Sequence, residues 1–218
     1  MRPSSSPDKT KTFEITAVVA TAIGKFFFMD YLNWKLPFIV TAIIFWICHI
    51  LYQRKKNARI LKHWGFRTDN FWEATRIILP FAITAFFLLI CIGFNQRTLL
   101  ITWHVLPILV LYPFWGTIQQ FLLMALTCGN LYDYKNAKIP KSVIILITAA
   151  LFGLIHYPSV WLMVGTFLLA ICYCWIYLRQ RNLYALGIFH GWLGALIFYT
   201  VVNRDPFVET FGRILDIH

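Results

Sequence analysis

The sequence has too few charged residues to cover a water-facing surface. Asp, Glu, Lys and Arg make up 13% of its 218 residues, whereas 59% are hydrophobic and the mean hydropathy is +0.65. Soluble domains carry about 25% charged and roughly 45–50% apolar residues. The composition therefore excludes an ordinary soluble domain. Because the apolar residues come in blocks of about 20, it predicts an integral membrane protein.

Paired cysteines and carboxylates at membrane depth are also scarce. The five cysteines form no CxxC pair, and Cys172 and Cys174 would point to different faces of a helix. Glu14, Asp30 and Glu73 lie near the ends of the hydrophobic blocks, so no carboxylate is expected at depth. Any polar chemistry inside the membrane must then come from histidine and amide side chains.

Positive charge is abundant but confined to certain segments. The formal net charge is +11, and 15 of the 20 Lys and Arg residues fall in the N-terminal tail and in segments 54–76, 135–141 and 179–181. These segments occupy every second loop, which the positive-inside rule places in the cytoplasm together with the N-terminus. The aromatic residues lie in the hydrophobic blocks, so no nucleic-acid partner is expected. The expected partner is the lipid bilayer, and His63, in a basic loop, should face solvent or lipid.

Seven hydrophobic blocks predict an all-α membrane protein with about seven transmembrane helices. They cover about 13–29, 35–52, 74–94, 99–127, 142–156, 159–178 and 183–202. The fourth block is too long for one straight span and contains Pro107 and Pro113, which predicts a kink or break. Only Tyr157-Pro158-Ser159 separates the fifth block from the sixth, which predicts a tight turn within the membrane.

The chain divides on this pattern into four parts. Residues 1–12 form a cytoplasmic tail, and residues 13–69 form two spans with a basic cytoplasmic loop. Residues 70–202 form the membrane core, and residues 203–218 form a C-terminal tail.

Four polar residues within the blocks are the candidate site: Gln119, Gln120, His156 and His190. A polar side chain in hydrocarbon is costly, and hydrogen bonds between helices would explain each residue taken singly. Together they indicate one site on three helices. At about 1.5 Å per residue, Gln119 and His190 lie at similar depth, whereas His156 comes out roughly 10 Å deeper unless its helix starts earlier or tilts. His49 and His104, nearer the block ends, are expected to pack or to lie at the interface.

The order of these residues resembles the CPBP (Abi) family of intramembrane proteases, which includes CAAX prenyl endopeptidases. That family carries an EExxxR motif, an FxxxH motif and a later histidine followed after four residues by Asn or Asp. Phe152 to His156 matches the second motif in full, and Asn182-Leu183 followed by His190 resembles the third in placement. The resemblance covers about residues 70–202.

The resemblance implies an endopeptidase that cleaves membrane-associated peptides or proteins, in a bacterial inner (plasma) membrane. It also implies that the four candidate residues are the catalytic ones. The chain departs from the family where it matters chemically: Gln119 and Gln120 replace the paired glutamates, Met124 replaces the arginine, and Gly194 stands for Asn or Asp. An amide cannot accept a proton as a carboxylate can, although it can donate hydrogen bonds or hold a water.

Three functions remain open on the sequence. The first is an intramembrane endopeptidase with a modified site; the second is a non-catalytic pseudoprotease that binds a membrane peptide or partner in an immunity or regulatory role. The third is a small transporter or channel subunit, which would fit seven helices with polar groups near the midplane, but the sequence lacks internal repeats and intramembrane charges. His156 and His190 are the only candidate metal ligands, and two histidines without a carboxylate or thiolate make a poor zinc site.

Overall fold

The structure, a computed structural model, describes the backbone of residues 7–134 and 138–215, and side chains up to residue 212. Over these ranges the chain forms helices and no strands. The α-helices are α1 (Asp8–Gly24), α2 (Lys35–Lys56), α3 (Ile60–Trp64), α4 (Phe71–Gln96), α5 (Val105–Gln120), α6 (Asn130–Tyr132), α7 (Lys141–Leu154), α8 (Val160–Arg179), α9 (Leu183–Ile197) and α10 (Pro206–Leu215). Three π-helical segments continue them: η1 (Lys25–Tyr31), η2 (Phe121–Gly129) and η3 (Phe198–Val202).

The predicted all-α membrane fold is confirmed. Within the described residues, six helices are long and apolar enough to cross a membrane: Asp8–Tyr31, Lys35–Lys56, Phe71–Gln96, Val105–Tyr132, Val160–Arg179 and Leu183–Val202. The seventh predicted span corresponds to α7, which is apolar but has only 14 residues. Together these elements agree with about seven transmembrane helices.

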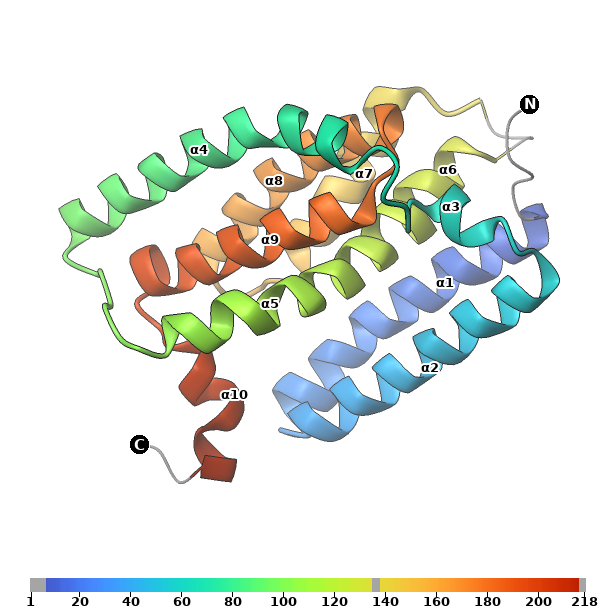
Figure 1. Ribbon diagram of the computed structural model, residues 1–218. Helices are drawn as coiled ribbons and strands as arrows, with labels where there is room; N and C mark the ends of the chain where they lie inside the picture. The colour runs from blue at the N-terminus through green and yellow to red at the C-terminus, as the bar shows by residue number, and fades with distance from the viewer. Residues whose placement is uncertain (1–6, 135–137, 216–218) are drawn as a thin grey trace.

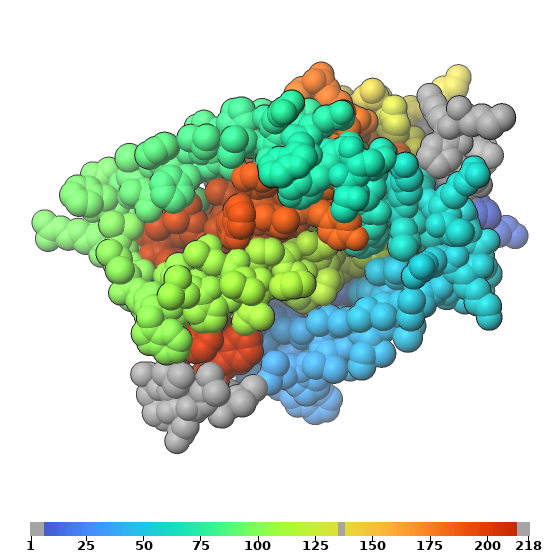
Figure 2. All heavy atoms as spheres, in the orientation of Figure 1, coloured from blue at the N-terminus to red at the C-terminus, as the bar shows by residue number. Residues whose placement is uncertain are grey.

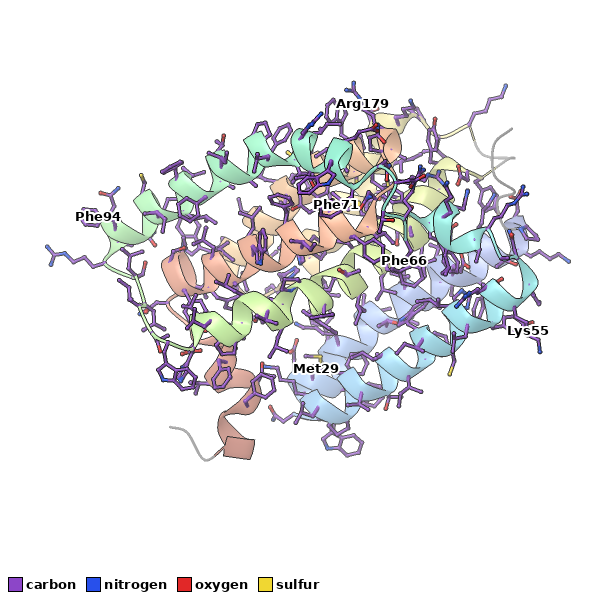
Figure 3. The ribbon with its side chains drawn as sticks, in the orientation of Figure 1. Met29, Lys55, Phe66, Phe71, Phe94 and Arg179 are labelled. Atoms are coloured by element: carbon purple, nitrogen blue, oxygen red, sulfur yellow. The ribbon has the colours of Figure 1, made fainter. Side chains whose placement is uncertain are left out.

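Large apolar side chains cover the outside of the bundle. Ile101 is 94% exposed, Phe94 72% and Trp72 71%. In water such a surface would be a docking site or an aggregation hazard, whereas in a bilayer it faces lipid. The basic ends of the helices lie together: Figure 3 shows Lys55 and Arg179 toward one end of the bundle and Phe94 at the opposite end.

The centre of the bundle is the pair α5 and α9. Figure 1 shows α4 on one flank of this pair and the α1–α2 hairpin on the other, with α7 and α8 behind. The start of α1 and the helix α10 lie at opposite ends of the bundle. The helices begin and end near the predicted boundaries, although α1 starts within the predicted N-terminal tail and α10 forms within the predicted C-terminal tail.

The long fourth span is not one regular α-helix. The span is helical from Val105 to Tyr132 and changes to π-helix at Phe121. Pro113 has no N–H to donate to the carbonyl of Leu109 one turn earlier. Trp192 of α9 supplies that hydrogen bond instead, from Nε1 to Leu109 O at 3.1 Å. The proline is therefore accommodated by the neighbouring helix.

The predicted tight turn near Pro158 is present. Helix α7 ends at Leu154 and α8 begins at Val160. The amide of Ser159 donates to His156 O at 3.0 Å, which closes the turn. This turn packs α7 and α8 directly against each other as neighbours in the bundle.

Candidate functional site

Three glycines let α5 and α9 approach closely enough to form the site. A Cβ added to Gly116 would lie 2.6 Å from Gly187 O, and one added to Gly187 would lie 2.1 Å from Thr117 Oγ1. A Cβ on Gly191 would lie 2.4 Å from the nitrogen of Pro113. Small residues at a membrane helix crossing allow this backbone proximity. The close crossing brings side chains of the two helices within hydrogen-bonding distance one turn further along.

Gln119 of α5 and His190 of α9 are in direct contact. The distance from His190 Nε2 to Gln119 Oε1 is 2.9 Å. With the amide oxygen as the acceptor, Nε2 carries the imidazole proton and Nδ1 keeps its lone pair. His190 is only 6% exposed, and Nδ1 has no hydrogen-bond partner among the described residues. The pair therefore presents a buried nitrogen that can accept a proton.

The ring of Phe152 lies against both histidines of the predicted site. Its centroid is 4.9 Å from that of His156 and 5.4 Å from that of His190. His156 Nδ1 donates to Phe152 O at 2.7 Å, which leaves Nε2 as the acceptor. The side chain of His156 therefore folds back toward the start of α7. Both histidines thus lie against the Phe152 ring, although counting along the backbone predicts a depth difference of roughly 10 Å. Thr166 of α8 adds a second contact to His156, 3.3 Å from Oγ1 to Nδ1.

Gln120 occupies a different position from its neighbour. Its side chain is completely buried, and neither Oε1 nor Nε2 has a hydrogen-bond partner among the described residues. Buried amides in native proteins are almost always paired with protein or water. Over the part of the chain that the structure describes, no contact joins Gln120 to either histidine. The structure therefore connects Gln119, His190, Phe152 and His156 in one cluster that does not include Gln120.

Asn182, part of the third motif, fixes the start of α9. It is fully buried, and its Oδ1 accepts from Ala185 N at 2.9 Å, which caps the helix. Its Nδ2 donates to Asn70 Oδ1 at 2.8 Å and to Arg67 O at 2.9 Å. This network ties α9 to the segment before α4. Asn182 thus positions His190, two turns further on, without contacting it.

The donor set does not suit a resident metal ion. Among the described residues, no group of three or more His, Cys, Asp or Glu side chains could hold one. A catalytic zinc site uses three protein ligands, and the site offers two histidines beside neutral amides. The chemistry of the site must therefore be considered for its side chains alone.

One carboxylate outside the predicted site is buried, which the sequence analysis did not predict. Glu14 of α1 is fully buried, and its Oε1 lies 3.0 Å from His49 Nε2 of α2. Asn130 of α6 donates to Glu14 Oε2 at 2.6 Å. Glu14 lies near a block end, as expected, but its side chain faces the protein. The cluster joins the N-terminal hairpin to the core, and the packing role expected for His49 agrees with this geometry.

His63 was expected to face solvent or lipid, and that expectation is wrong. Its side chain is 9% exposed and lies 3.0 Å from Asp133, which also receives two hydrogen bonds from Arg181 at 2.9 Å. Burial alone would raise the pKa of the Asp133 carboxyl. The hydrogen bond from His63 and the charge of Arg181 outweigh it, so this pKa lies below its ordinary value. The loop is anchored because three connections of the bundle meet there.

Comparison with known proteins agrees with this geometry. A family model described as Type II CAAX prenyl endopeptidase Rce1-like matches residues 101–196. No curated protein and no solved structure matches the chain. The matched segment covers less than half of the chain but includes α5, α7 and most of α9, with all four predicted site residues. The predicted resemblance to CPBP and CAAX-protease-like proteins is thereby confirmed over this segment of an integral, multi-pass membrane protein.

Proposed function

We propose that the chain is an intramembrane endopeptidase with a neutral, modified site that cleaves membrane-associated peptides or proteins. The observation that carries this proposal is the contact between Gln119 and His190, with Phe152 and His156 alongside, inside the segment that matches the endopeptidase family. Two imidazoles that each keep an unprotonated nitrogen supply the base that the glutamates would otherwise supply.

The reaction follows from these nitrogens. Nδ1 of His190 accepts a proton from water as the water oxygen adds to the peptide carbonyl carbon. The resulting oxyanion accepts from the amide of Gln120, whose Nε2 has no partner among the described residues and whose side chain must turn toward the histidines to donate. The imidazolium then returns its proton to the leaving amine nitrogen as the C–N bond breaks. Gln119 holds the ring of His190 in the orientation and tautomer that this sequence of steps needs.

A pseudoprotease is the second candidate, and the same two glutamines favour it. An amide cannot take a proton from water, so a site without its glutamates retains the scaffold and loses one base. A neutral site also has no unpaired buried charge. In this case the chain binds a membrane peptide or partner without cutting it, in an immunity or regulatory role.

Proteolysis of membrane-anchored peptides, prenylated and unprenylated, by the purified protein separates the two candidates. We expect cleavage by the wild-type chain and a loss of about 10²–10⁴-fold in His190→Ala and His156→Ala, the usual contribution of a general base. His104→Ala is the matched control, because His104 pairs with Asp205 and lies in neither the site nor its contacts.

The Gln119→Glu/Gln120→Glu variant tests the alternative that the natural site is inactive. If only this variant cleaves, the endopeptidase proposal is wrong and the natural site is that of a pseudoprotease. If the wild-type chain cleaves and the histidine variants cleave equally well, the activity belongs to a contaminant or to another part of the chain.

We also propose a plasma-membrane location with the N-terminus in the cytoplasm. Support comes from the basic residues at the ends of α2 and α8, which lie toward one end of the bundle (Figure 3). A periplasmic or extracellular reporter fused to the C-terminus should be active and the same reporter at the N-terminus inactive. The reverse pattern would invert the orientation.

A further inference from the structure

An apolar groove runs along the bundle on the face away from the candidate site. Helix α4 packs on α9 and α5 packs on α9, and the space between α4 and α5 has a volume of about 950 Å³. Figure 2 shows α9 at the floor of the hollow between them. His190 faces Phe152 of α7, whereas Phe189, Leu193 and Leu196 of α9 line the groove. The groove and the site therefore lie on different sides of α9.

The walls offer nothing for an occupant to hydrogen-bond. Three lining side chains carry polar atoms, and all are already paired. Trp192 Nε1 donates to Leu109 O at 3.1 Å, Tyr199 Oη donates to Asp205 at 3.0 Å, and Thr200 Oγ1 donates to Leu196 O at 2.7 Å. An extended peptide would bury unpaired N–H and C=O groups there, at several kcal/mol each. The lining therefore selects a hydrocarbon chain.

A whole transmembrane helix is too large to be enclosed by the groove. A 20-residue helix, 10–12 Å wide and 30 Å long, fills roughly 2,400–3,400 Å³. That is at least twice the volume of the groove, about 950 Å³. Along α4 the lining runs from Leu79 to Ile90, about 17 Å at 1.5 Å per residue. One leaflet of the hydrocarbon core is about 15 Å thick, so the groove has the length of a single acyl chain.

The groove is held open at one end by the backbone and carries a free cation there. Leu100 N donates to Tyr199 O at 2.8 Å and Thr98 Oγ1 donates to Thr200 O at 2.6 Å, which fixes the α4–α5 connection on η3. Arg97, next to this connection, is exposed, and its side chain has no hydrogen bond or ion pair among the described residues. A guanidinium binds phosphate oxygens in a bidentate manner.

We propose that this groove is a binding site for a bilayer glycerophospholipid of the leaflet on the side of the α4–α5 connection. One acyl chain lies between α4 and α5 on α9, and the lipid phosphate contacts Arg97. This proposal does not depend on the endopeptidase function, because the groove and the site share no side chain.

Titration of delipidated protein with a phosphatidylglycerol carrying 16-carbon chains, in mixed micelles, tests the site by native mass spectrometry. We expect one saturable lipid per chain. Ile83→Trp, which fills the groove midway along α4, should weaken binding at least fivefold. Leu88→Trp is the matched control, because Leu88 is 58% exposed on the same helix and does not line the groove. Leu109→Trp, on the opposite wall, should act as Ile83→Trp does.

Two further measurements test whether the ligand is a phospholipid with both a headgroup and an acyl chain in the site. Arg97→Gln should weaken binding about tenfold through loss of a charged hydrogen bond, and inorganic phosphate should not displace the lipid. Equal lipid binding by Ile83→Trp, Leu109→Trp and Leu88→Trp would show ordinary annular lipid and overturn the proposal. Displacement by inorganic phosphate would show an anion site without a chain-binding groove and would overturn it as well.

Discussion

A buried acid in this chain is found where the membrane core meets the N-terminal hairpin, and a buried neutral pair is found at the candidate site. Glu14 is compensated by His49 on one carboxylate oxygen and by Asn130 on the other. Gln119 and His190 need no such compensation, because both side chains are neutral when Oε1 accepts from Nε2. The buried carboxyl group of Glu14 thus lies in a fully hydrogen-bonded structural cluster, away from the candidate site.

Removal of Glu14 tests the structural cluster. Glu14→Ala leaves His49 and Asn130 buried without their acceptor, and loss of one partner of a buried charged pair costs about 3–5 kcal/mol. We expect a clearly lower thermal unfolding midpoint in detergent. Glu73→Ala is the control, since Glu73 is exposed and its contact with Gln180 spans 3.3 Å; such surface contacts contribute about 0–1 kcal/mol. Equal midpoints for the two variants would mean that the cluster adds no stability.

Single residues also show what the sequence could and could not predict. Counting residues along two helices predicts similar depths for Gln119 and His190, and their side chains are in contact. The position of Glu14 along α1 was predicted correctly, but the burial of its side chain against the protein was not. Burial depends on which face of the helix meets the protein, and polar and apolar residues alternate around α1 without marking one apolar face. His63 was misjudged for the related reason that its partners, Asp133 and Arg181, come from distant loops.

Among the helices, span positions were predictable because the length of an apolar run reports the thickness of the bilayer. The π-helical segment η2, which begins at Phe121 directly after the two glutamines, was not. Hydrophobicity does not distinguish an i→i+5 from an i→i+4 ladder, and π-helical turns are common at functional sites. The two prolines predict a kink or break in this span, and the structure adds that the Leu109 carbonyl, which Pro113 leaves without a backbone donor, accepts from Trp192.

The close approach of α5 and α9 can be tested by adding a methyl group at one of the glycines between them. Gly187→Ala would place a methyl group 2.1 Å from Thr117 Oγ1 and 2.6 Å from Thr117 Cα, so the helices must separate. We expect the Gln119–His190 contact to break, with a loss of stability of about 1–3 kcal/mol, typical of overpacking. Gly194→Ala is the matched control on the same helix, since a Cβ at Gly194 would lie 4.0 Å from Tyr112 Cδ1, an ordinary van der Waals contact.

A cysteine pair can report this separation directly. Oxidative cross-linking between cysteines introduced at Tyr112 and Gly194, in otherwise equivalent backgrounds, should slow in Gly187→Ala. Unchanged cross-linking together with an unchanged unfolding midpoint would show that the crossing tolerates the methyl group, and the close approach would then not be what positions the site.

The two ends of the molecule are each closed by a carboxylate. At one end Asp133 joins the connections around α3, α6 and α8 through His63 and Arg181. At the other, Asp205 accepts from Tyr199 at 3.0 Å, contacts His104 at 2.6 Å and caps α10 through the amide of Phe207 at 2.9 Å. Loops far apart in the sequence are thus fixed at both ends, which explains why neither cluster could be found from local sequence patterns.

These two carboxylates set the expected acid sensitivity of the whole molecule. Burial raises the pKa of Asp205, but hydrogen bonds from His104 and Tyr199 outweigh it, so this pKa, like that of Asp133, lies below the ordinary value of 3.8. Each group therefore binds more protons in the unfolded chain than in the folded one as the pH falls past its ordinary pKa. The stability that each carboxylate contributes is complete above about pH 5 and is lost as the pH falls through the folded-state pKa.

Thermal unfolding midpoints in detergent between about pH 3 and pH 7 should fall steeply at the acid end for the wild-type chain. The fall should be shallower for Asp133→Asn/Asp205→Asn, which starts from a lower midpoint at neutral pH because both clusters have lost their charge. Parallel curves for the two proteins would show that the carboxylates at the ends do not control acid unfolding.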